Sequence, residues 1–195
     1  MQNGTVFLYK DDVSKPLKID IKDIQFWYGL VGKAINFFTG KPYVHVKVLI
    51  NGKTYESTVW VDNSGKLHNG LKITEGEPTD YYSYVEPLFP EEFTRARIAA
   101  FEYYMNEVAK DRLKYNFFGL VVLAIVYPTR HLWRAIGWVP FSNRYVWGDF
   151  CSSFVDGVVY KKGLCIDLFK DEKESYTAPA DFLNSWFLSE EKIRS

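Results

Sequence analysis

An Asn-Gly pair at positions 51–52 constrains the fold of this chain more than any other feature. It separates two runs rich in β-branched and aromatic residues, YVHVKVLI at 43–50 and KTYESTVW at 53–60. Asn-Gly between two such runs is the strongest short-range signal for a two-residue β-hairpin turn. Pairing the runs outward from this turn makes His45 and Glu56 diagonal neighbours on one face of the sheet. The sequence therefore predicts a hairpin that brings an imidazole close to a carboxylate.

The same register gives Glu56 a second partner. When the two turn residues are left unpaired, Ile50 pairs with Lys53, and Lys47 then stands opposite Glu56. A carboxylate in this position either orients the imidazole of His45 or forms a solvated ion pair with Lys47. Both interpretations remain open at this point.

Further patterns predict that the sheet continues and that helices flank it. Alternation at 17–21, continued through 23–26, predicts a strand, and 30–38 has helical spacing that ends at Gly40. A turn at 62–65 and extended segments near 71–73 and 82–85 predict an antiparallel meander that follows the hairpin. Pro90 and the two glutamates after it predict a helix start, and this helix reaches about Lys110. Its expected apolar face consists of Phe93, Ala96, Ala100, Tyr104 and Val108.

Another helix is predicted to begin at Cys151 and to end at Gly163. Residues 151, 154, 155, 158 and 159 form one apolar stripe, and Asp149 is a suitable N-cap. Cys151 is then placed in the first turn, where unpaired backbone N–H groups and the helix dipole favour an anion. Cys165 lacks such surroundings and is expected to be an ordinary core residue.

Composition excludes several classes of protein. The chain has 24 Lys and Arg against 24 Asp and Glu, so there is no overall basic field that would attract nucleic acid. Aromatic residues make up 18% of the chain, which excludes disorder and favours some aromatic side chains that face a ligand or an apolar surface. The apolar run at 117–127 is about half as long as a membrane-spanning helix requires, so a core helix and no transmembrane segment are expected.

Cysteine and histidine usage limits the chemistry further. Two cysteines are too few for a disulfide scaffold, and the first residues lack the pattern of a secretory signal, so a cytoplasmic location is expected. Clusters with metal-ligand spacing are missing, so neither a metal nor a cofactor is expected. His68 and His131 are interpreted as structural residues. The length of 195 residues fits a single domain over 1–195, with an aromatic-rich helical insertion around 111–147.

Three residues fit the roles of a cysteine nucleophile and its partners. Such a nucleophile needs an imidazole to hold its proton and a polar group to orient that imidazole. Cys151, His45 and Glu56 can take these roles. All three histidines precede Cys151, so the order found in papain, with the cysteine first, is impossible for this residue.

The chain resembles the circularly permuted NlpC/P60 group of papain-like thiol enzymes, the YiiX/YaeF-like proteins. More distantly, it is similar to the lecithin:retinol acyltransferase-like enzymes. In this group the histidine strand precedes the cysteine helix. The resemblance extends from about residue 20 to residue 185, and the order of its segments is its most specific feature. The segments that carry it are DIQF at 23–26, INFFTGKPYVH at 35–45, KTYES at 53–57, YNFFGL at 115–120, FCSSFV at 150–155 and APADF at 178–182.

This resemblance implies an α+β, papain-like domain in which an antiparallel sheet packs against the helix headed by Cys151. It also implies amide or peptide hydrolysis through an acyl-enzyme, with cell-wall peptides as one possible substrate class. Lys47 departs from the family pattern, which has small residues after the histidine-valine pair. Tyr43, Tyr115 and Trp147 are the candidate substrate-binding residues, and buried packing is the alternative interpretation of Tyr115.

Two other functions remain open on the sequence alone. A lipid-directed thiol acyltransferase or thioesterase would use the apolar run at 117–127 and the aromatic residues Trp133, Trp138, Phe141 and Trp147. A catalytically degenerate domain that binds a peptide would follow if Lys47 captures Glu56. The expected partner is accordingly a peptide or amide substrate, or else a lipid, and no nucleic acid.

Overall fold

The computed structural model describes residues 1–10, 33, 37, 40–62, 64–109, 113–115, 129, 151–169 and 177–194. In these residues an antiparallel six-stranded sheet and a few helices form an α+β architecture. The strands are β1 (Thr5–Lys10), β2 (Tyr43–Ile50), β3 (Lys53–Val61), β4 (Leu67–Glu75), β5 (Ser83–Val85) and β6 (Lys192–Ile193). The helical elements are η1 (Pro90–Glu92), α2 (Arg95–Tyr103), η2 (Tyr104–Ala109), α5 (Cys151–Ser153), η5 (Phe154–Gly163) and η6 (Pro179–Asn184).

The β2–β3 hairpin forms as the Asn-Gly pair predicts. Ile50 pairs with Lys53, and the register continues to Val48 and Tyr55. Asn51 and Gly52 adopt φ angles of 50° and 71°, and a two-residue turn of type I′ requires positive φ at both central positions. The predicted turn after β3 and the strand after it are also present, and β4 pairs with β3 along its whole length.

The predicted meander is wrong in its last step. The strand order is β4-β3-β2-β1-β5-β6, so β5 pairs with β1 and not with β4. β1 itself was not anticipated, because Val6 to Tyr9 is a short continuous apolar run without the alternation of a half-buried strand. Residues 5–8 are completely buried, which explains the missing alternation. β1 occupies the centre of the sheet and lies directly beside β2.

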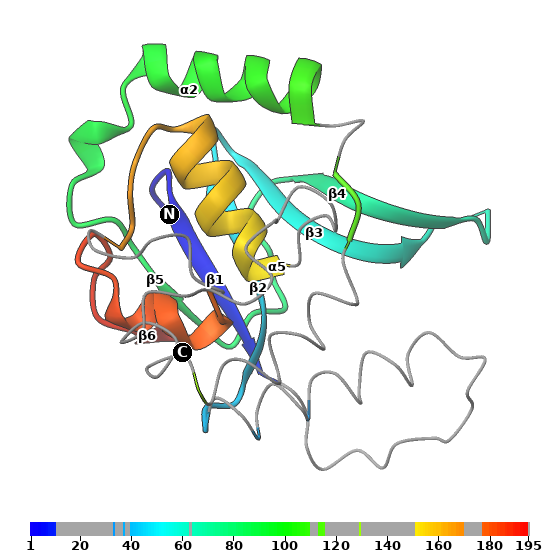
Figure 1. Cartoon of the computed structure of the whole chain (residues 1–195), viewed down its shortest axis with the longest axis horizontal. Helices are drawn as coiled ribbons and strands as arrows, with labels where there is room; N and C mark the ends of the chain where they lie inside the picture. The colour runs from blue at the N-terminus through cyan, green and yellow to red at the C-terminus, as the bar shows by residue number, and fades with distance from the viewer. Residues whose placement is uncertain are drawn as a thin grey trace.

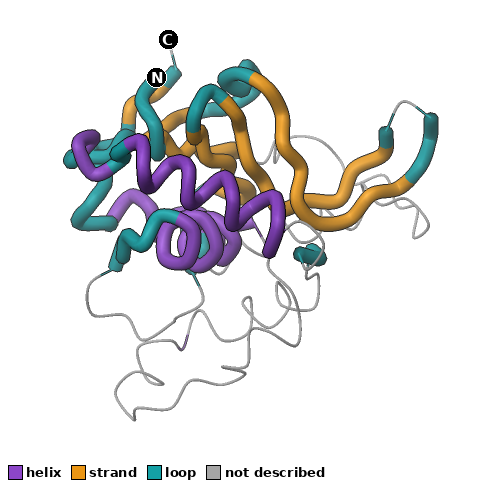
Figure 2. The backbone as a smooth tube through the Cα atoms, turned by 90° about the horizontal axis from the view of Figure 1, so that it is seen from above, coloured by secondary structure: helices purple, strands orange, loops and turns teal. Residues whose placement is uncertain are grey.

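The helices gather on one side of the strands, as Figure 2 shows. The α5–η5 segment runs across the sheet, with α5 at the end nearest β2 and β3 (Figure 1). One hydrophobic core lies between the sheet and this segment. Its buried members include Val6, Leu8, Val46, Val48, Tyr55 and Val85 from the strands and Phe154, Val155, Val158 and Val159 from the helix.

The first helix begins later than the sequence predicted. Pro90–Glu92 is a separate turn of 3-10 helix, and α2 starts at Arg95, where the Thr94 hydroxyl caps the helix by accepting a hydrogen bond from the Arg97 N–H. The predicted apolar face is correct only in part. Phe93 is buried and Tyr104 packs partly buried against the core, as predicted, but the prediction is wrong for Ala96 and Ala100, which are exposed. The chain changes direction between the two elements, and Phe101 and Met105 are buried instead.

The second helix agrees with the prediction in its apolar stripe, but the expectation for Cys165 is wrong. Cys151, Phe154, Val155, Val158 and Val159 are all buried, and the helix ends at Gly163. Beyond it Cys165 is exposed. Its φ of 55° turns the chain so that the flanking Leu164 and Ile166 point into the core instead.

Several predictions fall outside the described residues. These are the strand at 17–26, the run at 117–127, the segment at 131–141, the rest of the proposed insertion apart from 113–115 and 129, and the Asp149 cap. Of the helix expected at 30–38, Lys33 and Phe37 are described and are helical. Gly40 has a φ of 64°, as a helix-ending glycine requires. Within the described ranges, no helix has the length and apolarity needed to cross a membrane.

The contact between η5 and α2 generates a prediction about stability. A Cβ atom added at Gly163 would lie 2.6 Å from Cδ2 of Phe101, whose side chain is fully buried in the core. We expect Gly163→Ala to lower the free energy of unfolding by about 1–3 kcal/mol through overpacking. In the Gly163→Ala/Phe101→Leu double variant, urea denaturation should show a favourable coupling between the two changes. A Gly163→Ala protein more stable than the parent would contradict the close approach.

Candidate active site

His45 and Glu56 meet across the β2–β3 hairpin. The Nε2 atom of His45 lies 2.8 Å from Oε2 of Glu56, and the N–H donates because an ionised carboxylate can only accept. Backbone pairing between the two strands runs from the turn to Val48 and Tyr55. Beyond this point the β3–β4 hairpin extends away from β2 (Figure 1). The two side chains therefore meet where the strands begin to separate and α5 packs against both.

Glu56 lies at the centre of a charged network. Its side chain is 7% exposed, and its carboxylate has a lysine on each side. The Nζ atom of Lys47 is 3.7 Å from Oε2, and that of Lys72 is 3.7 Å from Oε1. Burial alone would raise the pKa of Glu56, but the hydrogen bond and charge of His45, together with Lys47 and Lys72, lower it below the ordinary value. Glu56 is thus a buried carboxylate that stays ionised.

The imidazole of His45 interacts with both Glu56 and Cys151. Burial alone would lower the pKa of His45. The charge of Cys151 and a hydrogen bond with it oppose this effect, Glu56 adds smaller contributions of the same kind, and together they raise the pKa to about 9. Since Glu56 occupies Nε2, Nδ1 is the ring nitrogen left for the thiol. The ring also packs edge-on against Tyr9, with 5.7 Å between ring centroids. These contacts favour a protonated imidazole beside the sulfur.

Cys151 is the first described residue of the α5–η5 segment, and its side chain is completely buried. Its Sγ atom donates to the carbonyl oxygen of Val44, 3.9 Å away, which places the thiol next to the backbone that carries His45. The sequence therefore identified three residues that the fold brings together from β2, β3 and α5.

The structure describes two of the three candidate substrate-binding residues, Tyr43 and Tyr115. Tyr43 is buried on β2, and its hydroxyl donates to the carboxylate of Glu191 in the C-terminal segment. Tyr115 is buried as well, and its backbone N–H donates to the side chain of Asn69 on β4. Trp147 lies outside the described residues. Their contact with a substrate stays a prediction.

Sequence reasoning missed three members of the network. Tyr9 stands opposite His45 in the β1–β2 register, and Lys72 stands opposite Glu56 in the β3–β4 register. Asp80 lies 3.7 Å from Nζ of Lys47. Extending the hairpin register to the next strand would have found Lys72, whereas Tyr9 required knowledge of the central position of β1.

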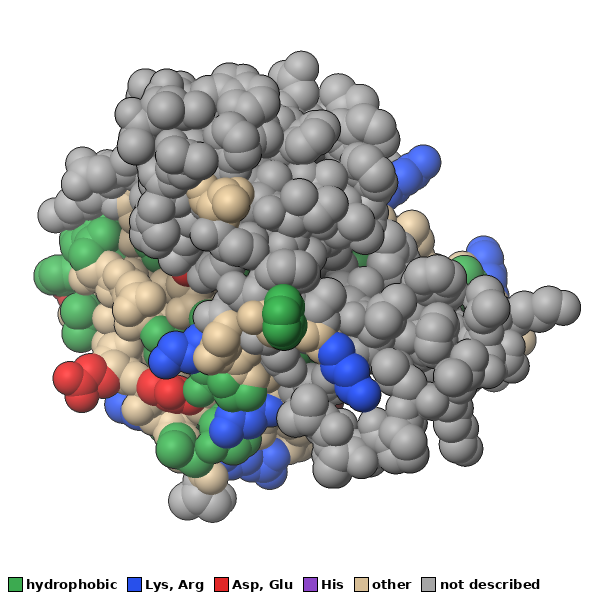
Figure 3. Space-filling view, turned by 60° about the horizontal axis from the view of Figure 1, so that its bottom comes forward, with side chains coloured by type: hydrophobic (Ala, Val, Ile, Leu, Met, Phe, Trp, Pro, Cys, Tyr) green, Lys and Arg blue, Asp and Glu red, His purple; other side chains and the backbone are tan. Residues whose placement is uncertain are grey.

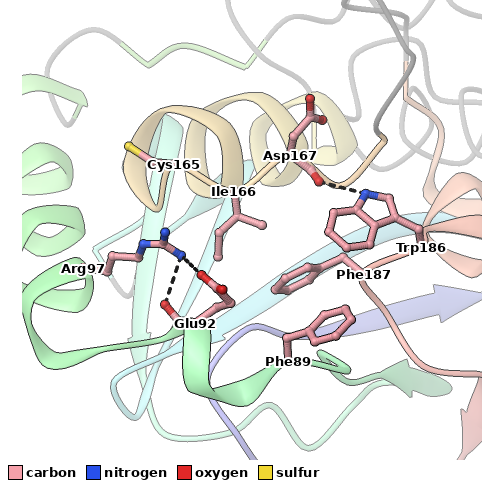
Figure 4. Close-up of a pocket in the computed structure, with 8 residues that line it drawn as sticks. All are labelled: Phe89, Glu92, Arg97, Cys165, Ile166, Asp167, Trp186 and Phe187. Carbon is pink, nitrogen blue, oxygen red and sulfur yellow. Dashed lines mark hydrogen bonds and ion pairs between the residues drawn. The ribbon is translucent and has the colours of Figure 1, made fainter.

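A cavity of about 320 Å³ lies elsewhere, and none of the three candidate catalytic residues lines it. It opens where the chain leaves η5, and Figure 4 shows the rings of Phe89, Trp186 and Phe187 on one side with the Glu92–Arg97 ion pair on the other. Cys165 is at its rim. The cavity is therefore separate from the site around His45.

Two other kinds of site receive no support from the described residues. In the described ranges, no group of three or more His, Cys, Asp and Glu side chains is placed to hold a metal ion. On the face drawn in Figure 3, the described lysine and arginine side chains lie among hydrophobic and acidic ones and form no continuous basic field.

The raised pKa of His45 predicts how stability depends on pH. The folded value of about 9 exceeds the ordinary value of 6.5, so this group stabilises the fold fully below pH 6.5 and loses that effect as the pH rises through 9. We expect the free energy of unfolding to fall by about 1–3 kcal/mol over this window. Urea denaturation at several pH values measures it. This loss of stability should be much smaller in His45→Gln, and in His68→Gln it should be as large as in the parent protein. A loss in His45→Gln as large as in the parent would show that groups other than His45 cause it.

Neither a scan against protein-family models nor a search of the curated proteins finds a match to this chain.

Proposed function

We propose that this protein is a cysteine-dependent hydrolase of the amidase or peptidase type. Cys151 is the nucleophile, His45 the general base and Glu56 the group that orients His45. The 2.8 Å hydrogen bond between His45 and Glu56, with the Cys151 thiol 3.9 Å from the carbonyl oxygen of Val44 next to His45, is the observation that carries the proposal. A carboxylate, an imidazole and a thiol in this order form the arrangement that nucleophilic cysteine catalysis needs.

The reaction follows from this order of groups. His45 already holds the proton of the thiol at Nδ1, and the thiolate Sγ of Cys151 bonds to the substrate carbonyl carbon. Backbone N–H groups at the start of the helix stabilise the oxyanion that forms. As the oxyanion collapses, the bond to the leaving amine breaks and the amine receives the proton from His45. A water molecule deprotonated by His45 then adds to the acyl carbon and releases Cys151.

The permuted papain-like arrangement is part of this proposal. Its support is the antiparallel sheet, the histidine strand that comes before the cysteine helix, and the packing of that helix against the sheet. The resemblance noted in the sequence implies the same arrangement. Amide hydrolysis is preferred over lipid chemistry because the balanced charge of the chain, 24 Lys and Arg against 24 Asp and Glu, offers no electrostatic help to binding at an acidic lipid surface.

The contact distances argue against a degenerate site. Lys47 does reach Glu56, at 3.7 Å, but Nε2 of His45 is much closer at 2.8 Å. Both partners contact Oε2, so the carboxylate holds His45 and Lys47 simultaneously. The ion pair therefore leaves the orienting hydrogen bond intact.

Thiol labelling tests the role of His45. Because Cys165 is exposed and Cys151 buried, the two thiols must be compared in single-cysteine proteins, Cys165→Ser and Cys151→Ser. In Cys165→Ser, the change His45→Ala should slow iodoacetamide labelling of Cys151 by about 10-fold or more, because the imidazole no longer accepts the thiol proton. The same change in Cys151→Ser should leave the labelling of Cys165 unaltered. Equal rates with and without His45 would contradict the pairing.

Intact-mass analysis tests the hydrolase itself. The Cys165→Ser protein is exposed in turn to p-nitrophenyl acetate, a peptide p-nitroanilide and phospholipid vesicles. We expect the two soluble donors to add the mass of one acyl group, and Cys151→Ser should remain unmodified. An adduct from the phospholipid alone would replace the amidase with the lipid-directed enzyme, and no adduct with any donor would contradict the proposal.

A further inference from the structure

The carboxylate of Glu56 has more charged neighbours than orienting one imidazole requires. Its two oxygens are occupied from different strands, with His45 and Lys47 of β2 on Oε2 and Lys72 of β4 on Oε1. Such contacts on both oxygens restrict rotation of the carboxylate about its last bond. They also place two positive charges against one negative charge on a side chain that is only 7% exposed to solvent.

Lys47 is itself held in place by groups outside the hairpin. Its side chain is 15% exposed, and its Nζ atom lies 3.7 Å from Asp80 and 4.6 Å from the ring centroid of Tyr9. The hydroxyl of Tyr9 donates to the same Asp80 carboxylate at 3.2 Å. A lysine with this many contacts has lost the freedom of a surface side chain, so its position relative to Glu56 is defined.

A carboxylate beside a catalytic imidazole has two opposing effects. It fixes the orientation of the ring, but its negative charge also stabilises the imidazolium and opposes release of the proton. A base that must return its proton to a leaving group works best when this stabilisation is limited. Positive charges beside the carboxylate limit this stabilisation and leave the hydrogen bond intact.

We propose that Lys47 and Lys72 are positioning residues of this site, which fix the Glu56 carboxylate against His45 and offset part of its charge so that His45 can release its proton. The inference rests on the proposed function for the use of that proton. The charged and titratable groups around Glu56 are His45 and Lys47 on β2, Lys72 on β4, Tyr9 on β1, Asp80 in the loop before β5 and Cys151 on α5.

Titration of His45 by NMR, with its signal assigned from His45→Gln, tests the proposal without any substrate. Lys47→Met and Lys72→Met keep most of the aliphatic stem but remove the charge. Each should raise the His45 pKa, by roughly half a unit for Lys47 and less for the more exposed Lys72, because Glu56 then acts on the imidazole with more of its charge. In Lys47→Arg, which keeps the positive charge, the pKa of His45 should equal that of the parent protein.

Lys53→Met is the matched control. Lys53 forms an ion pair of the same length, 3.7 Å, with Glu75 on the same two strands as the Lys72–Glu56 pair, but away from His45. The Lys53→Met substitution should leave the pKa of His45 unchanged. A His45 pKa that falls or stays constant in both methionine variants would overturn the proposal. If Lys47→Met fails to fold, Lys72→Met and Lys47→Arg still decide it. The proposed hydrolase fails separately, by the absence of an acyl adduct on Cys151.

Discussion

The hydrogen bond between His45 and Glu56 is the interaction on which the proposed site depends, and it exists because a two-residue turn fixes one register. Side chains alternate between the faces of a strand, so a slip of one residue would place His45 and Glu56 on opposite faces of the sheet. The positive φ angles at Asn51 and Gly52 specify the turn that prevents this slip. Local backbone chemistry at the turn thus determines the geometry at His45 and Glu56, further along the two strands.

Burying Glu56 imposes a second constraint. Removing one partner of a buried ion pair commonly costs about 3–5 kcal/mol, because the remaining charge is left uncompensated. Glu56 therefore needs its cations, and the strands on both sides of β3 supply them. The same network connects Tyr9 and Asp80 to the site through Lys47, so that β1 and the loop before β5 contribute to its geometry.

Local signals in the sequence predicted the parts of the molecule that neighbouring residues determine. The Asn-Gly turn, the pairing of Ile50 with Lys53 and the apolar stripe that begins at Cys151 are of this kind, and all three are confirmed. The place of β1 between β2 and β5 depends on contacts between distant segments, and a run buried on both faces carries no alternation that would reveal it. The prediction for Cys165 is wrong because residue type predicts burial only on average. The turn after Gly163 determines that this side chain is exposed.

Comparing the His45 pKa in the parent protein and in Cys151→Ser tests the central claim most directly, because it asks whether thiol and imidazole form one unit. Cys151 is the largest contribution that raises this pKa, ahead of Glu56. An uncharged serine hydroxyl of similar shape removes the charge and keeps the packing. NMR titration should show a clear fall of the His45 pKa from about 9 toward its ordinary value in Cys151→Ser. An unchanged His45 pKa in that variant would mean that Cys151 and His45 do not act together, and it would contradict the account.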